Sequence, residues 1–292
     1  MSTDIAFAPV VDLVASLAPL GRAGDDLIDR FDGSVAVRTL RLAPTDQLVP
    51  YAAEITDHPG LTVHVSTDHA ELLPDLARAV AATLLTNRTA LADLAARDEP
   101  VARLARLYPG IVPVLYRDPL TALIRSISAQ QVNLRWAATI RARLAERYGT
   151  RHGLGEWAVW TLHPEPLADA RLEDLRALQL TTAKSQSVIA VAQAAQAGEL
   201  RLSDLDALSD EELIAHLTGL RGIGRWSAEW FLARTLGRPR VVAGDLGVRK
   251  AIGRLYGMPV VPTEDEVRRA TAHWGAAATH AQALALHDLV QP

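Results

Sequence analysis

A glycine-rich turn between two helical patterns is the part of the sequence best suited to contact a ligand. It reads LTGLRGIGRWSA (217–228), and its glycines are Gly219, Gly222 and Gly224. Glycine supplies the positive φ and the close backbone approach that a tight turn needs. The second helix begins with unpaired backbone N–H groups that suit a phosphate oxygen, and Arg221 and Arg225 add charge there. The turn could simply join two helices, but its basic flanks favour contact with nucleic acid.

Two tryptophans and one carboxylate follow the turn. Trp226 and Trp230 are four residues apart and share one face of the second helix. The pair could belong to the core, or it could stack on an extruded base and attract a cationic one by about 0.5–2 kcal/mol. Asp245 ends the loop GRPRVVAGD (237–245), where it could cap the next helix or act in catalysis.

The composition narrows the class of protein. The 292 residues are 49% hydrophobic and 22% charged, which is typical of a globular chain. Zero cysteines exclude disulfides, thiolate zinc sites and cysteine-bound iron–sulfur clusters. No uncharged apolar run reaches about 18 residues, so no membrane span is expected. The N-terminus lacks the basic start of a secretory signal, and a cytoplasmic location is expected.

Positive charge is concentrated around the turn, although the net charge of the whole chain is −4. Residues 217–256 hold eight Lys and Arg residues against Glu229 and Asp245, a local balance of +6. An arginine-rich genome would explain the use of arginine but not its clustering. A basic patch on an acidic protein can bind phosphate.

Alternating apolar residues predict strands in the first 86 residues. The alternation covers SVAVRTLRL (34–42) and LTVHVST (61–67), with turn signals FDGS (31–34) and DHPG (57–60) before them. Helical patterns cover 10–17 and 70–86. The sequence therefore predicts an N-terminal domain at 1–86, with a small antiparallel sheet and helices on one of its faces.

The pattern from residue 87 onward is helical, so the fold class is α+β with an all-helical region at 87–292. Asp118 precedes Pro119, as at a helix start. RHGLGEW (151–157) is expected to be a surface loop. The predicted helical stretches are 88–107, 119–149, 164–179, 183–198, 209–218, 225–236, 246–256 and 264–291.

The turn and its following loop resemble a known family. LTGLRGIGRWSA resembles the helix-hairpin-helix of the DNA glycosylase superfamily, and GRPRVVAGD resembles its Gly/Pro-rich loop ending in the catalytic aspartate. LIRSISAQQV (123–132) and LTTAKSQSVIAVAQA (180–194) resemble further signatures of the AlkA-type 3-methyladenine DNA glycosylases II. The resemblance covers nearly the whole chain. It implies an extra N-terminal sheet domain and two helical subdomains with an active-site cleft between them.

The resemblance assigns a role to each candidate site residue. Asp245 is the expected catalytic residue, because a carboxylate stabilises an oxocarbenium-like sugar and can orient water. The expected base pocket consists of Trp226, Trp230 and Gln130, and Gln131 holds the position of the wedge that fills the vacated stack. The DNA backbone is expected to contact Gly219, Gly222, Gly224, Arg221, Arg225 and Lys250. The backbone carbonyls of Thr218, Leu220 and Ile223 are expected to hold a structural Na⁺ or K⁺.

The expected activity is base excision by hydrolysis. Bifunctional relatives carry a Schiff-base lysine where this chain has Trp226. The resemblance thus implies a monomeric, monofunctional glycosylase that flips 3-methyladenine- or 7-methylguanine-type bases from duplex DNA, with no catalytic cofactor. Two alternatives stay open: a DNA-damage-binding protein without catalysis, and a lyase that uses Lys250.

One segment departs from the family pattern. Many AlkA-like proteins carry a Trp-x-Pro-aromatic-Arg-Ser-Tyr-Ala stretch, where this chain has WGAAATHA (274–281). Ala277 replaces the pocket aromatic and His280 replaces the tyrosine. The sequence therefore predicts a wider pocket on that side, with His280 either at the helix surface or in contact with the base.

Overall fold

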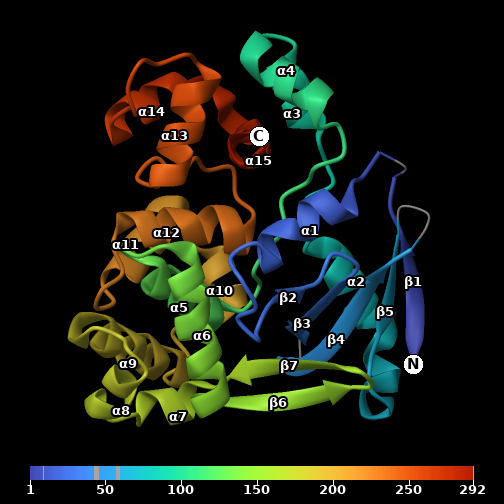
Figure 1. The fold of residues 1–292 in the computed structure, drawn as a ribbon, viewed down its shortest axis with the longest axis vertical. Coiled ribbons are helices and arrows are strands. Elements are labelled where there is room, and N and C mark those ends of the chain that lie inside the picture. Colours follow the sequence, from blue (N-terminus) through green and yellow to red (C-terminus); the bar gives the residue numbers. More distant parts are fainter. Residues whose placement is uncertain (9, 43–45, 57–59, 292) are drawn as a thin grey trace.

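The computed structural model describes residues 1–8, 10–42, 46–56 and 60–291. The chain forms two lobes, and the sheet lies in the lobe that is lower in Figure 1. None of the described helices is long and apolar enough to cross a membrane. Three residues of the expected DHPG turn, 57–59, lie outside the described residues.

A five-stranded antiparallel sheet confirms the strand prediction. Its order is β1-β5-β4-β3-β2. The strands are β1 (Ser2–Ala6), β2 (Arg30–Phe31), β3 (Val35–Leu42), β4 (Gln47–Ile55) and β5 (Gly60–His64). Leu40 and Tyr51 contribute to the main hydrophobic core, whereas Val37 and Ala52 contribute to a small cluster on the other face. Both faces of β3 are therefore buried.

A β-hairpin covers that second face, and here the prediction of a surface loop at 151–157 was wrong. Strands β6 (Gly149–Leu154) and β7 (Trp157–Leu162) pair antiparallel. Leu154 and Val159 pack in the small cluster, and Gly155 turns the chain at φ +65°. The β-branched and aromatic residues of WAVWTL suit a strand, so the helical region contains one hairpin.

The helices are shorter than the predicted stretches because caps divide them. The helices of the first 107 residues are α1 (Leu13–Gly21), η1 (Thr67–Leu72), α2 (Leu73–Ala82), α3 (Thr89–Ala95) and α4 (Glu99–Leu107). The central helices are α5 (Pro119–Ala129), α6 (Leu134–Tyr148), α7 (Pro164–Ala168), α8 (Leu172–Ala177), α9 (Thr182–Gln196), α10 (Leu202–Ala207) and α11 (Asp210–Thr218). The last elements are α12 (Arg225–Phe231), η2 (Leu232–Leu236), α13 (Leu246–Leu255), α14 (Glu264–Thr271), η3 (Ala272–Ala277) and α15 (Ala278–Leu289). Asp118 caps α5 as expected, since its Oδ1 accepts from Thr121 N at 2.7 Å.

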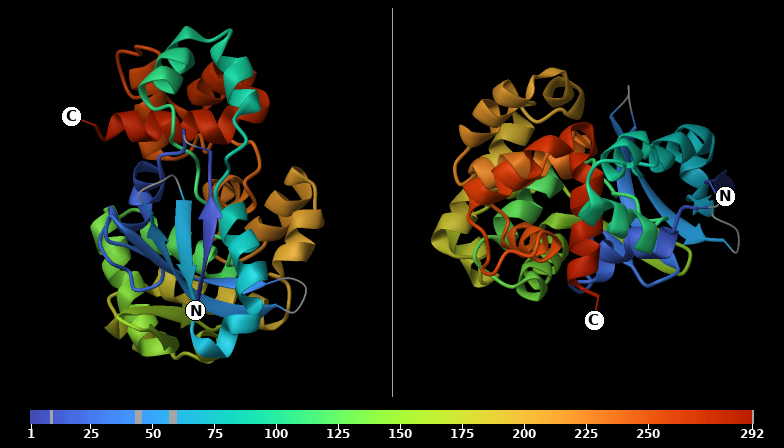
Figure 2. Two further views of the ribbon diagram at one scale, coloured as in Figure 1. Left: turned by 90° about the vertical axis from the view of Figure 1, so that its right-hand side faces the viewer. Right: turned by 90° about the horizontal axis from the view of Figure 1, so that it is seen from above.

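The hydrophobic clusters do not follow the order of the sequence, because segments far apart in the chain pack together. The largest cluster joins the sheet, α2 and the helices from α5 to α12, whereas α3 and α4 pack with α13–α15 in a second cluster. Both views of Figure 2 show the teal helices beside the red ones. Tyr108, at the end of α4, links this helix to α15, because its Oη donates to Asp288 Oδ1 at 2.9 Å. The expected domain boundary after residue 86 stays a prediction.

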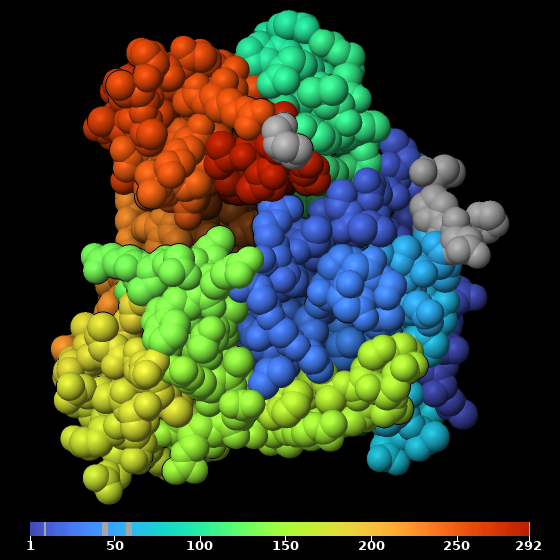
Figure 3. Space-filling view, viewed as in Figure 1, coloured from blue at the N-terminus to red at the C-terminus, as the bar shows by residue number. Residues whose placement is uncertain are grey.

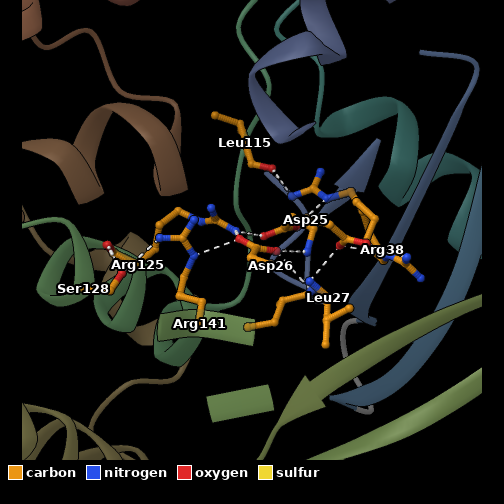
Figure 4. Close-up of polar contacts among 11 residues, drawn as sticks. Asp25, Asp26, Leu27, Arg38, Leu115, Arg125, Ser128 and Arg141 are labelled. Atoms are coloured by element: carbon orange, nitrogen blue, oxygen red, sulfur yellow. Dashed lines mark hydrogen bonds and ion pairs between the residues drawn. The ribbon is translucent and has the colours of Figure 1, made fainter. Parts of the chain in front are cut away.

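A buried network of arginines and aspartates joins the sheet to the helices (Figure 4). Arg125 on α5 contacts Asp29 Oδ2 at 2.5 Å and Asp26 Oδ2 at 2.9 Å. Arg141 on α6 contacts the same Asp26 oxygen at 2.8 Å, and Arg38 on β3 contacts Asp29 Oδ1 at 2.6 Å. All five side chains are buried. They fix α5 and α6 against the N-terminal segment.

The network keeps Asp26 ionised. Burial of Asp26 acts to raise its pKa, but the charges of Arg125 and Arg141 and the backbone N–H of Asp29 outweigh burial and lower it. The stabilisation from this carboxylate is therefore present above its unfolded pKa of about 3.9. It is lost as the pH falls through the lower pKa of the folded state.

Removing Arg125 should destabilise the whole fold. We expect Arg125→Met to lower the free energy of unfolding in urea by about 3–5 kcal/mol at pH 7, because it leaves buried aspartates short of a partner. Arg30→Met is the matched control, since its partner Asp25 is half-exposed and such pairs contribute about 0–1 kcal/mol. Equal losses in the two variants would contradict a special role for the buried network.

Candidate active site

A cavity of about 770 Å³ lies between the lobes, lined by residues from α1, the 111–116 segment, the start of α6, α12, α13 and α15. Figure 3 shows the molecule hollowed between the green, blue and dark red segments. Trp226, Trp230 and Asp245 all line this cavity. The structure thus brings together the aspartate and both tryptophans that the sequence singled out.

Asp245 caps α13 and also lines the cavity, so capping does not exclude the catalytic role that the sequence left open. Its Oδ1 accepts from Val248 N at 3.0 Å, as an N-cap does. Its Oδ2 accepts from the indole Nε1 of Trp226 at 3.1 Å. The two hydrogen bonds hold one half-buried carboxylate in a fixed orientation, with lone pairs left for a ligand.

Tyr116 extends the aromatic wall of the cavity, and no local motif in the sequence indicated it. Its ring centroid lies 5.5 Å from that of Trp230. The Arg125 guanidinium lies over the Tyr116 ring, with Cζ 4.5 Å from the centroid. The buried ion network therefore supports the wall that carries Trp230.

The hairpin between α11 and α12 depends on Gly222. This residue has φ +76°, and a Cβ there would lie 1.9 Å from Ser187 Oγ and 2.7 Å from Ser187 Cβ on α9. Gln130 braces the same turn, because its Nε2 donates to the Gly222 carbonyl at 3.0 Å. Gln130 does not line the cavity, so the structure places it against the hairpin rather than in the expected base pocket.

Asp210, which lies outside residues 217–256, neutralises part of the positive charge around the hairpin. Arg238 and Arg240 both contact Asp210, at 2.9 and 2.5 Å. Arg225 Nε contacts the buried Glu229, which the balance already includes, at 3.0 Å. The local balance of +6 overstated the basic patch because it left out Asp210. Arg221 and Lys250 are exposed, and Lys250 does not line the cavity.

An apolar group stands at the rim of the cavity, close to the expected wedge. Gln131 is exposed at φ +55° in the turn between α5 and α6. Leu134, three residues later, is 63% exposed and also lines the cavity. Trp136 is 36% exposed, beside the Arg143 guanidinium. Sequence analysis missed Leu134, although an apolar residue just after a helix cap was the available signal.

The expected widening of the pocket at Ala277 was wrong. Ala277 is buried in the second hydrophobic cluster, and His280 Nε2 donates to the Leu85 carbonyl at 2.8 Å. Burial lowers the pKa of His280. Neither residue lines the cavity. The turn at Gly275, with φ +49°, directs this segment into the core.

The hairpin carbonyls fit a monovalent cation. Within residues 1–8, 10–42, 46–56 and 60–291, no backbone N–H outside a helix donates to the carbonyls of Thr218 or Ile223. The Leu220 carbonyl accepts from Ile223 N at 3.1 Å and retains one lone pair. Neutral carbonyl oxygens suit a hard cation of low charge.

Residues 124–276 match the HhH-GPD superfamily of base excision DNA repair proteins, and the chain belongs to this family. It is 30% identical to DNA-3-methyladenine glycosylase 2 of Escherichia coli, over 63% of this chain and 65% of that one. A DNA-3-methyladenine glycosylase of Bacillus subtilis is 28% identical over 61% and 60%. The matched part thus spans less than two thirds of each relative. These names confirm the resemblance to AlkA-type glycosylases.

The fold also resembles that of a solved structure. The 3-methyladenine DNA-glycosylase from Archaeoglobus fulgidus superimposes with a TM-score of 0.83 over 98% of each chain, at 23% identity. At that identity the likeness shows the fold. It agrees with the predicted α+β class, an N-terminal sheet followed by a mainly helical region.

Replacing Gly222 should disrupt the hairpin. We expect Gly222→Ala to lower the free energy of unfolding by about 1–3 kcal/mol, since the new Cβ meets Ser187 and the left-handed φ is unfavourable. Thermal unfolding would measure this. Gly224→Ala is the control, because its φ is −97° and a Cβ there meets no atom within 4 Å. A larger loss in Gly224→Ala would refute the argument.

Proposed function

We propose that the protein is a monofunctional DNA glycosylase that extrudes a damaged base from duplex DNA and hydrolyses its N-glycosidic bond. One observation carries the proposal: Asp245 and two tryptophans face the same cavity, immediately beyond a helix hairpin of the HhH-GPD family. An extruded base needs such an aromatic pocket. The glycosidic carbon needs a carboxylate beside it.

Bond cleavage follows from these positions. The base lies against Trp226 and Trp230, and its sugar C1′ lies next to Asp245. The C1′–N bond breaks with its electron pair moving to the base, and the carboxylate stabilises the sugar cation. Water adds at C1′ and releases a proton, leaving an abasic site. The Trp226 hydrogen bond keeps the carboxylate aimed at this position.

Hydrolysis rather than lyase chemistry is favoured by the cavity wall. Among the residues that the structure describes, no lysine lines the cavity, and the exposed Lys250 lies on α13 outside it. A Schiff base with the sugar needs an amine at C1′. We therefore propose that the product is an intact strand with an abasic site.

The hairpin side is proposed to bind the duplex. Gly222 and Gly224 would present backbone N–H groups to a phosphate, whereas the N–H of Gly219 donates to carbonyls of α11. Arg221, Arg225 and Lys250 would add charge. A monovalent cation at Thr218, Leu220 and Ile223 would neutralise further phosphate charge. Gln131 and Leu134 would fill the space left by the extruded base. We propose that the protein acts as a monomer on chromosomal DNA in the cytoplasm.

Asp245→Asn should slow base release strongly and preserve DNA binding. We expect single-turnover base release from duplex DNA containing 3-methyladenine, 7-methylguanine or hypoxanthine to fall by about 10²-fold or more, because the charge that stabilises the cation is lost. The Kd for duplex DNA should stay within the wild-type range. Lesion binding without base release by either protein would instead support a damage-binding protein without catalysis.

A further inference from the structure

The cavity wall carries more positive charge than a pocket for a cationic base should. One carboxylate, that of Asp245, is found among its described lining residues. Five arginines line it: Arg22, Arg125, Arg135, Arg141 and Arg234. Asp26 and Asp29 pair with two of them, Arg125 and Arg141, behind the wall. No ion pair of the other three is found among the described residues; Arg22 and Arg135 are exposed, and Arg234 is half-buried.

Arg234 is the arginine best placed to contact a base. It lies on η2, a single π-helical turn directly after Trp230 and α12, and such turns often occur at functional sites. Its guanidinium lies over the Tyr116 ring, with Cζ 5.6 Å from the centroid. Its own carbonyl accepts from Tyr116 N at 2.8 Å, which fixes the two residues together. No hydrogen bond or ion pair of its side chain is found within the described part of the chain.

We propose that Arg234 selects an uncharged oxopurine, such as hypoxanthine, over a cationic methylated base. This inference rests on the proposed glycosylase function. The fork of the guanidinium matches the O6 and N7 acceptors of a purine, which an arginine can bind with two hydrogen bonds. Trp230 and Tyr116, 5.5 Å apart, provide the aromatic surface beside it. Hypoxanthine offers both acceptors, whereas methylation at N7 removes one.

The same contact would assist departure of a neutral base. When the C1′–N9 bond of a neutral purine breaks, the electron pair leaves with the base and makes it anionic. Donors held at O6 and N7 stabilise that charge until the base takes a proton from solvent. A cationic 7-methylguanine leaves as a neutral molecule and needs no such help. Arg234 therefore accelerates one class of substrate and repels the other.

The test compares two lesions in one duplex sequence. Single-turnover base release would be measured for hypoxanthine and for 7-methylguanine, with wild type, Arg234→Met and Arg234→Lys. We expect Arg234→Met to slow hypoxanthine release by about 10²-fold, as for loss of one oxyanion donor, and to leave 7-methylguanine release unchanged or faster. Arg234→Lys keeps the charge without the fork and should recover only part of the hypoxanthine rate.

Arg221→Met serves as the comparison, because loss of a phosphate contact should weaken binding of both duplexes equally. Equal slowing of both lesions by Arg234→Met would overturn the selective role. So would wild-type protein that releases 7-methylguanine but not hypoxanthine. Wild-type protein that releases neither would overturn the proposed glycosylase function itself. Thermal unfolding of each variant separates a folding defect from these outcomes.

Discussion

Arg125 contacts Asp26 and Asp29 on one side and the Tyr116 ring on the other, and it connects the sheet to the cavity wall. A buried arginine of this kind is stable only when its carboxylate partners are held in place. The partners lie in the short segment between α1 and β2, about a hundred residues away in sequence. The N-terminal segment therefore contributes to the site indirectly, by fixing α5 and, through it, Tyr116 and Trp230. The aromatic wall depends on this packing as well as on α12.

Asp245 caps α13 and also lines the cavity, whereas sequence analysis treated capping and catalysis as alternatives for this residue. Its hydrogen bond from Val248 N starts α13, and its hydrogen bond from Trp226 turns the second oxygen to the cavity. Capping thus positions the carboxylate that we propose to be catalytic, and the two roles do not compete. Gly222 likewise has two roles in the hairpin. It reverses the chain direction, and its carbonyl accepts a hydrogen bond from Gln130 Nε2. These few hydrogen bonds orient the hairpin, which we propose to bind DNA, and the Asp245 carboxylate, which we propose to lie beside the sugar of the extruded nucleotide.

Local patterns predicted the parts of the site that lie within one stretch of chain. The sheet, the hairpin glycines, the tryptophan pair and Asp245 follow from spacing within 217–251 and from period-two alternation. Tyr116, Arg125 and Arg234 were missed because each looks ordinary in its own helix or loop, and only tertiary packing brings them together. The charge count failed for the same reason, since Asp210 lies outside the counted window. Ala277 was misplaced because a short motif was matched without the packing that buries it.

The central claim is that the cavity receives an extruded base with its sugar beside Asp245. A crystal structure of the protein on duplex DNA with a 2′-fluoro hypoxanthine nucleotide, which resists cleavage, tests this directly. The account predicts the base between Trp226, Trp230 and Tyr116, with C1′ adjacent to the Asp245 carboxylate and the hairpin on the flanking phosphates. A base that remains stacked in the duplex, or a sugar remote from Asp245, would contradict it.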